Sequence, residues 1–486
     1  MSPYFIIAVL VAYFALLLVI SWFTSRKADN QSFFQANKSA PWYLVAFGMV
    51  GTSLSGVTFI SVPGTVGAEH FNYFQVVLGY FIGYFAVAFV LLPIYYRFNL
   101  TSIYNYLQHR FGMFSYKTGA LLFIVSRTLG ATLRLYLVIN VLQLFVLDAL
   151  GIPFHVTAAI ILAMIVLYTF KGGVKTIVWT DTLQTFFMLL ALVICVFYIM
   201  NDLGLNLSSA MAALNENGST QIFNFDISDK KYFLKQIIGG AFITISMTGL
   251  DQEMMQKNIS VRTLRDSQKN MITFSAIMVF VNFIFLLLGG LLYLYASSKG
   301  LAVKGDDLFP TIAMQYLPAA VSLIFIIGLI SALFPSADGA ITALTASTCI
   351  DLLGMQRDQK RTEEQKARTR KTVHLLFSVV FLVMVFLFKL MNNKEIISIL
   401  LKIAGYTYGP LLGLFTFGIF TKRVLTDKIA PAICLASPAI AVLIDQNSEL
   451  WFHGYKFGIE MLVINGLITF TGLWIFSRKD RMNVEV

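Results

Sequence analysis

Long runs of apolar residues dominate the chain and limit what it can fold into. A helix needs about 20 apolar residues to cross roughly 30 Å of hydrocarbon. We count thirteen such runs, near residues 3–23, 42–68, 73–96, 118–147, 152–170, 174–200, 236–255, 271–296, 319–349, 374–390, 397–420, 429–446 and 457–477. Hydrophobic residues make up 57% of the 486 residues, and the mean hydropathy of +0.75 is too high for a soluble domain. The sequence therefore predicts an all-α membrane protein with about 13 transmembrane helices.

The basic residues predict the orientation of the chain. Most of the 36 Lys and Arg residues fall in loops that are cytoplasmic if the N-terminus lies outside, and an excess of these residues is typical of cytoplasmic loops. The net charge of +11 is therefore an orienting signal and does not indicate a nucleic-acid partner. We expect a multi-pass protein of the plasma membrane, or of the inner membrane in a bacterium, with its N-terminus outside and its C-terminus in the cytoplasm. Its surroundings are the lipid bilayer, and no obligate protein partner is evident.

Two of the apolar runs are poor in helix formers. Each is rich in glycine and hydroxyl residues, which favour unwinding: Gly48, Gly51, Thr52, Ser53, Ser55, Gly56, Thr58, Ser61, Pro63 and Gly64 in the second run, and Gly239, Gly240, Thr244, Ser246, Thr248 and Gly249 in the seventh. We expect breaks near residues 51–56 and 244–249. The alternative is close packing of small residues without a break.

The two predicted breaks indicate an internal repeat. The segments lie five spans apart, and because five is odd they cross the membrane in opposite directions. This pattern is typical of an inverted five-helix repeat with a binding site between the broken helices. We assign an extra first helix and loop to residues 1–41, the first repeat to 42–200, the second to 236–420 and C-terminal helices to 421–486. A short external helix is expected near residues 208–216.

Charged side chains inside the predicted spans indicate an interior site. An ionisable group at bilayer depth costs on the order of 3 kcal/mol, yet four are present: Arg127, Arg134, Asp181 and Asp338. Asp181 either coordinates a cation, relays a proton, pairs with a base or caps a broken helix. Pro335 frees backbone carbonyls, which with Ser336 and Asp338 make a cluster of hard oxygens suited to an alkali cation. Asp251 and Glu253 are expected to cap a helix or pair with the following basic loop.

Five sequence segments together resemble the sodium/solute symporter family, which includes bacterial sialic acid, proline and galactose symporters and animal sodium/glucose cotransporters. They cover nearly the whole chain and read GTSLSGVTFISVPG, GGVKTIVWTDTLQ, TGLDQEMMQKN, SALFPSADGAIT and AGYTYGPLLGLFTFGIFTKR. The resemblance implies a leucine-transporter-like inverted repeat with one added N-terminal helix. It also implies that Na⁺ drives the uptake of a solute.

The resemblance further implies sodium ligands. One site takes backbone oxygens of Gly51, Leu54 and Ala332 and two hydroxyls at positions 335 and 336, of which this chain keeps only Ser336. A second site in some members uses the aspartate that matches Asp181 and two hydroxyls, at positions here Asp338 and Gly339. Either a stronger cation site or a proton-sharing acid pair follows from Asp338. We expect Asp181, Asp338 and Ser336 to be linked to the ion, which is Na⁺ or H⁺.

Solute contacts are expected at the break of the second run. By the same resemblance, Ser53, Ser55 and Thr58 match solute-binding positions. Arg127 and Arg134 are seven residues apart and so lie on nearly one face of a helix, where an arginine suits a carboxylate. The alternative is that one of them, Arg127 before Arg134, pairs with an acid or a carbonyl in a structural role.

Three functional classes follow from these observations. A secondary transporter of a small polar solute, such as a sialic acid or another carboxylate, fits the arginines best. A neutral sugar or other nutrient is the alternative solute, with proton-coupled or sodium-independent transport as the alternative mechanism because the site is altered at Pro335. An ion channel does not explain paired broken helices. A membrane enzyme requires a nucleophile with a base or a metal triad, and we find no such pattern.

Overall fold

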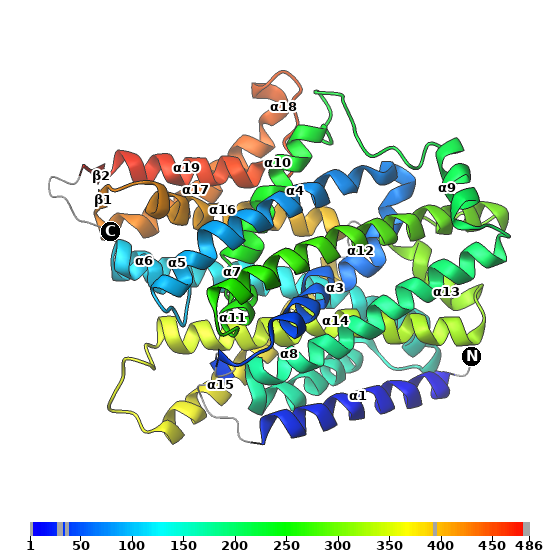
Figure 1. The fold of residues 1–486 in the computed structure, drawn as a ribbon, viewed down its shortest axis with the longest axis horizontal. Coiled ribbons are helices and arrows are strands. Elements are labelled where there is room, and N and C mark those ends of the chain that lie inside the picture. Colours follow the sequence, from blue (N-terminus) through cyan, green and yellow to red (C-terminus); the bar gives the residue numbers. More distant parts are fainter. Residues whose placement is uncertain (1–2, 27–32, 35–37, 392–395, 480–486) are drawn as a thin grey trace.

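The computed structural model describes residues 3–26, 33–34, 38–391 and 396–479 as a bundle of helices (Figure 1). The tail predicted to be cytoplasmic after residue 479, and parts of the loop before residue 41, lie outside the described residues. The helices are α1 Pro3–Ser25, α3 Trp42–Glu69, α4 Tyr73–Ala86, α5 Leu92–Arg97, α6 Asn105–Arg110, α7 Met113–Leu142, α8 Phe154–Asp202, α9 Leu207–Glu216, α10 Phe233–Thr244, α11 Gln252–Ile259, α12 Leu264–Ser298, α13 Leu308–Gln315, α14 Ala319–Ser347, α15 Glu363–Met391, α16 Ile396–Phe420, α17 Ala430–Gln446, α18 Ser448–Trp451 and α19 Met461–Ile475.

Short elements extend or join these helices. Wide π-helical turns cover Val87–Leu91, Gln143–Leu147, Ile245–Gly249 and Thr348–Leu352, and 3-10 turns cover His70–Asn72, Asp148–Leu150, Gly305–Asp307 and Asp427–Ile429. Two strands, β1 Val424–Leu425 and β2 Ser477–Arg478, pair antiparallel. The short helix expected near residues 208–216 is confirmed as α9, and Asn206 and Ser209 close its first turn with reciprocal side-chain hydrogen bonds.

The hydrocarbon of the bilayer explains why the chain is almost entirely helical. Hydrocarbon offers no partner to backbone amides, so a spanning segment must satisfy them within itself. In the described ranges, nine helical segments are long and apolar enough to cross a membrane, or ten if the bent pair of α10 and α11 forms one span. Phe154–Phe170 and Met461–Ile475 are apolar but shorter. The all-α membrane fold is thus confirmed, whereas the number thirteen stays a prediction.

Both predicted breaks are confirmed. Within α3, Ser55 has φ 28° and ψ 173°, which interrupts the helix beside Gly56. A positive φ is rare for a residue with a side chain. The chain from α10 to α11 bends by 65° at Leu250 and Asp251, directly after the predicted segment, because Asp251 starts α11 by accepting hydrogen bonds from the backbone amides of Glu253 and Met254.

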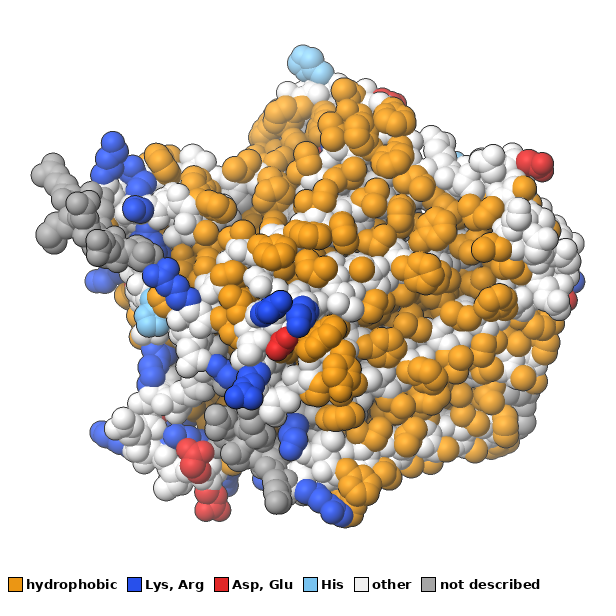
Figure 2. Space-filling view, in the orientation of Figure 1, with side chains coloured by type: hydrophobic (Ala, Val, Ile, Leu, Met, Phe, Trp, Pro, Cys, Tyr) orange, Lys and Arg blue, Asp and Glu red, His pale blue; other side chains and the backbone are white. Residues whose placement is uncertain are grey.

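The surface fits a membrane protein with one basic end. Figure 2 shows apolar side chains across the middle of the visible face, while most Lys and Arg gather near the end that carries the C-terminus. The N-terminus lies at the opposite end of the molecule in Figure 1.

Glycines bring the helices α4 and α10 into backbone contact. A Cβ on Gly79 would lie 2.2 Å from the carbonyl oxygen of Ile237, and a Cβ on Gly240 would lie 2.4 Å from that of Val76. Neither backbone can give way without separating the two helices. Close approach through small residues is a main way in which membrane helices associate.

We therefore expect Gly240→Ala to destabilise the protein by about 1–3 kcal/mol, the usual cost of overpacking a tight contact. Gly130→Ala is the matched control, because its nearest neighbour is the end of the Leu400 side chain at 3.7 Å. Thermal unfolding of both variants in detergent measures the difference. Equal unfolding temperatures would show that the α4 and α10 contact is loose.

Candidate functional site

A cavity of about 760 Å³, including its opening, lies where the two broken helices meet. Its walls come from α3, α4, α7, α10 with the following turn, α11, α12 and α16. All five predicted solute-binding residues line it: Ser53, Ser55, Thr58, Arg127 and Arg134. The structure thus brings together residues from both halves of the chain around one polar cavity.

The break in α3 explains the polar wall. At Ser55 the helix is interrupted, and Ser53, Ser55 and Thr58 all border the cavity around the interruption. Gly56 permits close packing here, because a Cβ on it would lie 2.0 Å from the Val138 side chain of α7. Hydroxyl groups beside an interrupted helix provide donors and acceptors for a polar solute.

The two arginines of α7 have different surroundings. Arg127 contacts Glu253 in a hydrogen-bonded ion pair and lies 3.6 Å from the carboxylate of Asp251. Asp251 also accepts a hydrogen bond from the Tyr408 hydroxyl at 2.9 Å. Arg127 therefore has the structural pairing that the sequence left open. The prediction that Asp251 caps a helix is correct, and Glu253 pairs with Lys257, the first basic residue after the predicted span. The additional pairing of both acids with Arg127 of α7 was not predicted.

Arg134 has no such partner. Its side chain is 9% exposed, its Nε has no hydrogen-bond partner, and no carboxylate of the described residues lies within 4.0 Å of its guanidinium. A buried cation without a counter-ion is costly, so a carboxylate in the cavity would stabilise it. Arg134 is therefore the side chain of the cavity that would gain most from an anionic ligand.

A row of tyrosine hydroxyls on α4 was not predicted from the sequence. Tyr73, Tyr80 and Tyr84 of α4 line the cavity, and the hydroxyls of Tyr73 and Tyr80 lie 3.4 Å apart. Their spacing of seven and four residues places them on one helical face, and this periodicity could have indicated them. Thr52, Thr244 and Thr248 also line the cavity; they belong to the predicted hydroxyl clusters but were not assigned to the solute. Asn282 of α12 was missed altogether.

Asp181 lies in an ion-pair network next to the cavity. Its Oδ2 accepts hydrogen bonds from the Lys257 ammonium at 2.7 Å and the Thr52 hydroxyl at 3.0 Å. Lys257 also contacts the hydroxyl of Thr52 at 2.6 Å and the carboxylate of Glu253 at 3.5 Å. Because Glu253 also forms an ion pair with Arg127, the network runs from α8 through α11 to α7. The sequence reading overlooked Lys257, although its position four residues after Glu253 could have suggested a pair.

Asp338 is the second predicted acid and has a different environment. Its carboxylate accepts hydrogen bonds from the Tyr168 hydroxyl and from the backbone amide of Gly339, each at 2.5 Å. In the described part of the chain, no Lys or Arg lies within 4.0 Å of it. The carboxylate is fully buried. Asp338 is close enough to Asp181 and to Lys257 to interact electrostatically with both, although it is in direct contact with neither.

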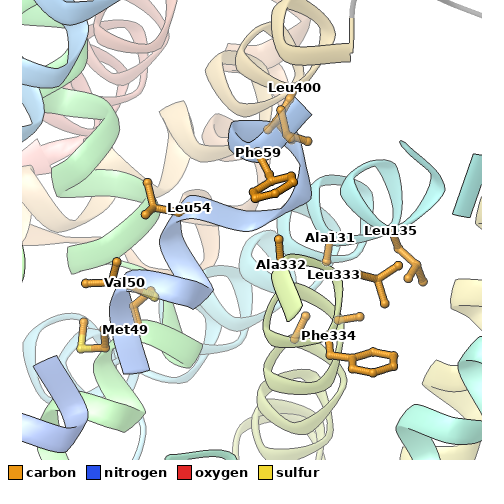
Figure 3. Packing of buried hydrophobic residues seen from close by; sticks show 14 of the residues in the cluster. Met49, Val50, Leu54, Phe59, Ala131, Leu135, Ala332, Leu333, Phe334 and Leu400 are labelled. Carbon is orange, nitrogen blue, oxygen red and sulfur yellow. The ribbon is translucent and has the colours of Figure 1, made fainter. Parts of the chain in front are cut away.

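The remaining predicted ion ligands are carried by α3 and α14, two helices that pack on each other. Figure 3 shows Ala332 of α14 beside the stretch of α3 between Leu54 and Phe59, which contains the bend. The backbone amide of Gly51 donates to the Thr185 hydroxyl at 3.0 Å, and the Ser336 hydroxyl donates to the carbonyl of Leu333 at 2.9 Å. The predicted ligands are backbone oxygens of α3 and α14 and the Ser336 hydroxyl, and oxygens of these types suit a hard monovalent cation.

We expect Arg127→Gln to destabilise the protein by about 3–5 kcal/mol, because it leaves Glu253 and Asp251 buried without their cation. Arg134→Gln, on the same helix, removes an unpaired charge and is expected to leave stability unchanged or to raise it. Thermal unfolding without solute measures both variants. A larger loss in Arg134→Gln than in Arg127→Gln would contradict this assignment of roles.

The chain is similar over nearly its whole length to two bacterial sodium/sialic acid symporters. The sodium/sialic acid symporter NanT of Aliivibrio fischeri is 22% identical over 94% of this chain and 90% of its own length. SiaT of Proteus mirabilis, also a sodium/sialic acid symporter, is 22% identical over 95% of this chain and 94% of its own length.

Solved structures show the same fold. A substrate-bound, outward-open structure of a Na⁺-coupled sialic acid symporter superposes with a TM-score of 0.83 at 18% identity and covers 98% of this chain and 99% of its own. The transporter Mhp1 in a closed conformation gives a TM-score of 0.56 at 13% identity and covers 92% of this chain and 93% of its own. These neighbours confirm the predicted leucine-transporter-like fold class. A model of the sodium:solute symporter family matches residues 33–428, which include every helix that lines the cavity, and the chain therefore belongs to that family.

Proposed function

We propose that the protein is a secondary transporter that couples Na⁺ to the uptake of a small polar solute bearing a carboxylate, with a sialic acid as the first candidate. The unpaired Arg134 guanidinium in the cavity is the observation that carries the proposal. The two curated bacterial relatives described above are sodium/sialic acid symporters. As in the rest of the family, the protein moves its solute without changing it chemically.

The chemistry of the cavity supports an anionic, hydroxyl-rich solute. A guanidinium can hold a carboxylate through two parallel hydrogen bonds. No carboxylate of the described residues contacts Arg134, so its guanidinium is available to a solute. The hydroxyls of Ser53, Ser55 and Tyr80 can exchange hydrogen bonds with the hydroxyls of a sugar acid. A neutral sugar would leave Arg134 buried without a counter-ion, so an anion is favoured.

We assign the coupling ion to the contact between α3 and α14. Backbone oxygens of Gly51, Leu54 and Ala332, the Ser336 hydroxyl and the nearby charge of Asp338 make up the proposed site. Asp338 supports this assignment, because its buried carboxylate lacks a cationic partner among the described residues. An arriving Na⁺ would supply the missing positive charge.

The proposed transport cycle requires a specific topology. We propose thirteen spans with the N-terminus outside and the C-terminus in the cytoplasm, arranged as an extra first helix, inverted repeats over 42–200 and 236–420, and two C-terminal helices. Two inverted repeats around one site permit access from either side in turn. The plasma membrane, or the inner membrane of a bacterium, is the proposed location, and no protein partner is required.

We expect Arg134→Lys to weaken binding of a sialic acid by about ten-fold or more. Lysine keeps the charge but cannot form the bidentate contact, which contributes about 1.5–3 kcal/mol. Solute-induced thermal stabilisation of the purified protein measures the change. Arg97→Lys, an exposed position away from the cavity, is the matched control. Unchanged binding in both Arg134→Lys and Arg134→Gln would remove the basis for an anionic solute.

We expect Asp338→Asn to raise the Na⁺ concentration needed for half-maximal uptake by about ten-fold or more, because a nearby unit charge contributes on the order of 2 kcal/mol. Asp351→Asn is the control. Asp351 is also buried and is held by hydroxyls, Tyr116 at 2.8 Å and Ser347 at 2.6 Å, but it is not in the proposed ion site. Uptake into proteoliposomes over a range of Na⁺ concentrations tests both, and equal shifts would contradict the assignment of Asp338.

A further inference from the structure

The Lys257 ammonium is itself a monovalent cation surrounded by hard oxygens. It lies 2.7 Å from Asp181 Oδ2, 2.6 Å from Thr52 Oγ1 and 3.5 Å from Glu253 Oε1. The residue is only 3% exposed, so water does not compete for these contacts. Carboxylate and hydroxyl oxygens of this kind would otherwise serve a free alkali cation.

We propose that Lys257 is the resident cation of Asp181, so that Na⁺ does not bind at Asp181 and the transporter holds a single Na⁺, between α3 and α14. The proposal rests on the sodium coupling proposed above and deepens it by limiting the number of ions. It also changes the role expected for Asp181, from an ion ligand to the fixed partner of a lysine.

The surroundings of Gly339 support this arrangement. A Cβ built on Gly339 would lie 2.3 Å from Glu253 Oε1, which is the oxygen that faces Lys257. A serine at position 339 could therefore not place a hydroxyl there without moving Glu253. The space next to Asp338 that a further ion ligand would need is taken by the carboxylate that helps to hold the lysine.

The charges around Asp181 also disfavour a Na⁺ ion at its second oxygen. Oδ2 carries the contacts to Lys257 and Thr52, while Oδ1 is buried without a hydrogen-bond partner among the described residues. A Na⁺ at Oδ1 would be repelled by the ammonium on the other oxygen of the same carboxylate. A neutral donor such as water meets no such repulsion, so Oδ1 does not call for a second cation.

A tethered cation has a consequence for coupling. Lys257 cannot leave with the solute, so its charge stays in the protein throughout the cycle and contributes nothing to the ion flux. Its removal, in contrast, would leave Asp181 as a bare buried carboxylate beside the Thr52 hydroxyl. Such a pocket should capture the commonest monovalent cation in solution.

The test counts Na⁺ ions bound to purified full-length protein, with radioactive sodium, in the wild type, Asp181→Asn, Lys257→Met, Lys257→Arg and the double variant Asp181→Asn/Lys257→Met. We expect the wild type and Asp181→Asn to bind one ion each. Lys257→Met should bind a second ion, and the double variant should lose that second ion again. Lys257→Arg is the matched control, since it keeps the charge and should gain no ion.

Three results would overturn the proposal: two Na⁺ ions bound to the wild type, loss of Na⁺ binding in folded Asp181→Asn, or a single ion in folded Lys257→Met. Size-exclusion profiles and solute-induced thermal stabilisation establish folding. If Lys257→Met does not fold, Asp181→Asn and the double variant, which removes both charges together, still decide between the two assignments. Wild-type uptake that does not depend on Na⁺ would contradict the proposed coupling instead, so the two failures are distinguishable.

Discussion

The ion-pair network from Asp181 to Arg127 is the constraint on which the site depends. Charges at this depth are costly unless they are paired, and here the pairing joins α8, α11 and α7 around the break in α3. Thr52 of α3 is hydrogen-bonded to both Asp181 and Lys257. The short helix α11 carries two members of the network, and its direction is set by the 65° bend and by the Asp251 cap. Since Met254 of α11 lines the cavity, the bend and the network together determine where that part of the wall lies.

The same network separates two kinds of charge. Arg127 and Lys257 are in direct contact with acids of the protein, whereas Arg134 and Asp338 have no oppositely charged group within 4.0 Å among the described residues. The unsatisfied cation and the unsatisfied anion correspond to an anionic solute and a cationic driving ion. In the proposed transporter, the bound carboxylate increases the local negative potential, and this favours the cation. Mutual stabilisation of this kind is a thermodynamic basis for symport.

Much of the fold could be predicted from the sequence, because hydrocarbon permits few backbone solutions. The apolar runs gave the helices, and the Gly and hydroxyl clusters located the breaks within a few residues. The polar wall formed by Ser53, Ser55 and Thr58 followed from the same clusters. Pairings could not be predicted in this way. The partner of Arg127 lies 126 residues away on a helix reached only through the bend, and Lys257 looked like the start of a cytoplasmic loop until the structure turned it inward.

The glycine contact between α4 and α10 has a mechanical consequence. Backbones that touch at Gly79 and Gly240 cannot slide past each other without separating, so the tyrosines of α4 and Thr244 of α10 keep a fixed spacing on the cavity wall. Leu400 and Leu401 of α16 also line the cavity, and α16 is held to α19 in the same way, because a Cβ on Gly413 would lie 2.5 Å from the carbonyl oxygen of Gly466. The cavity is thus bordered by two helix pairs that are each locked at a backbone contact, and a change in its width requires one pair to move against the other.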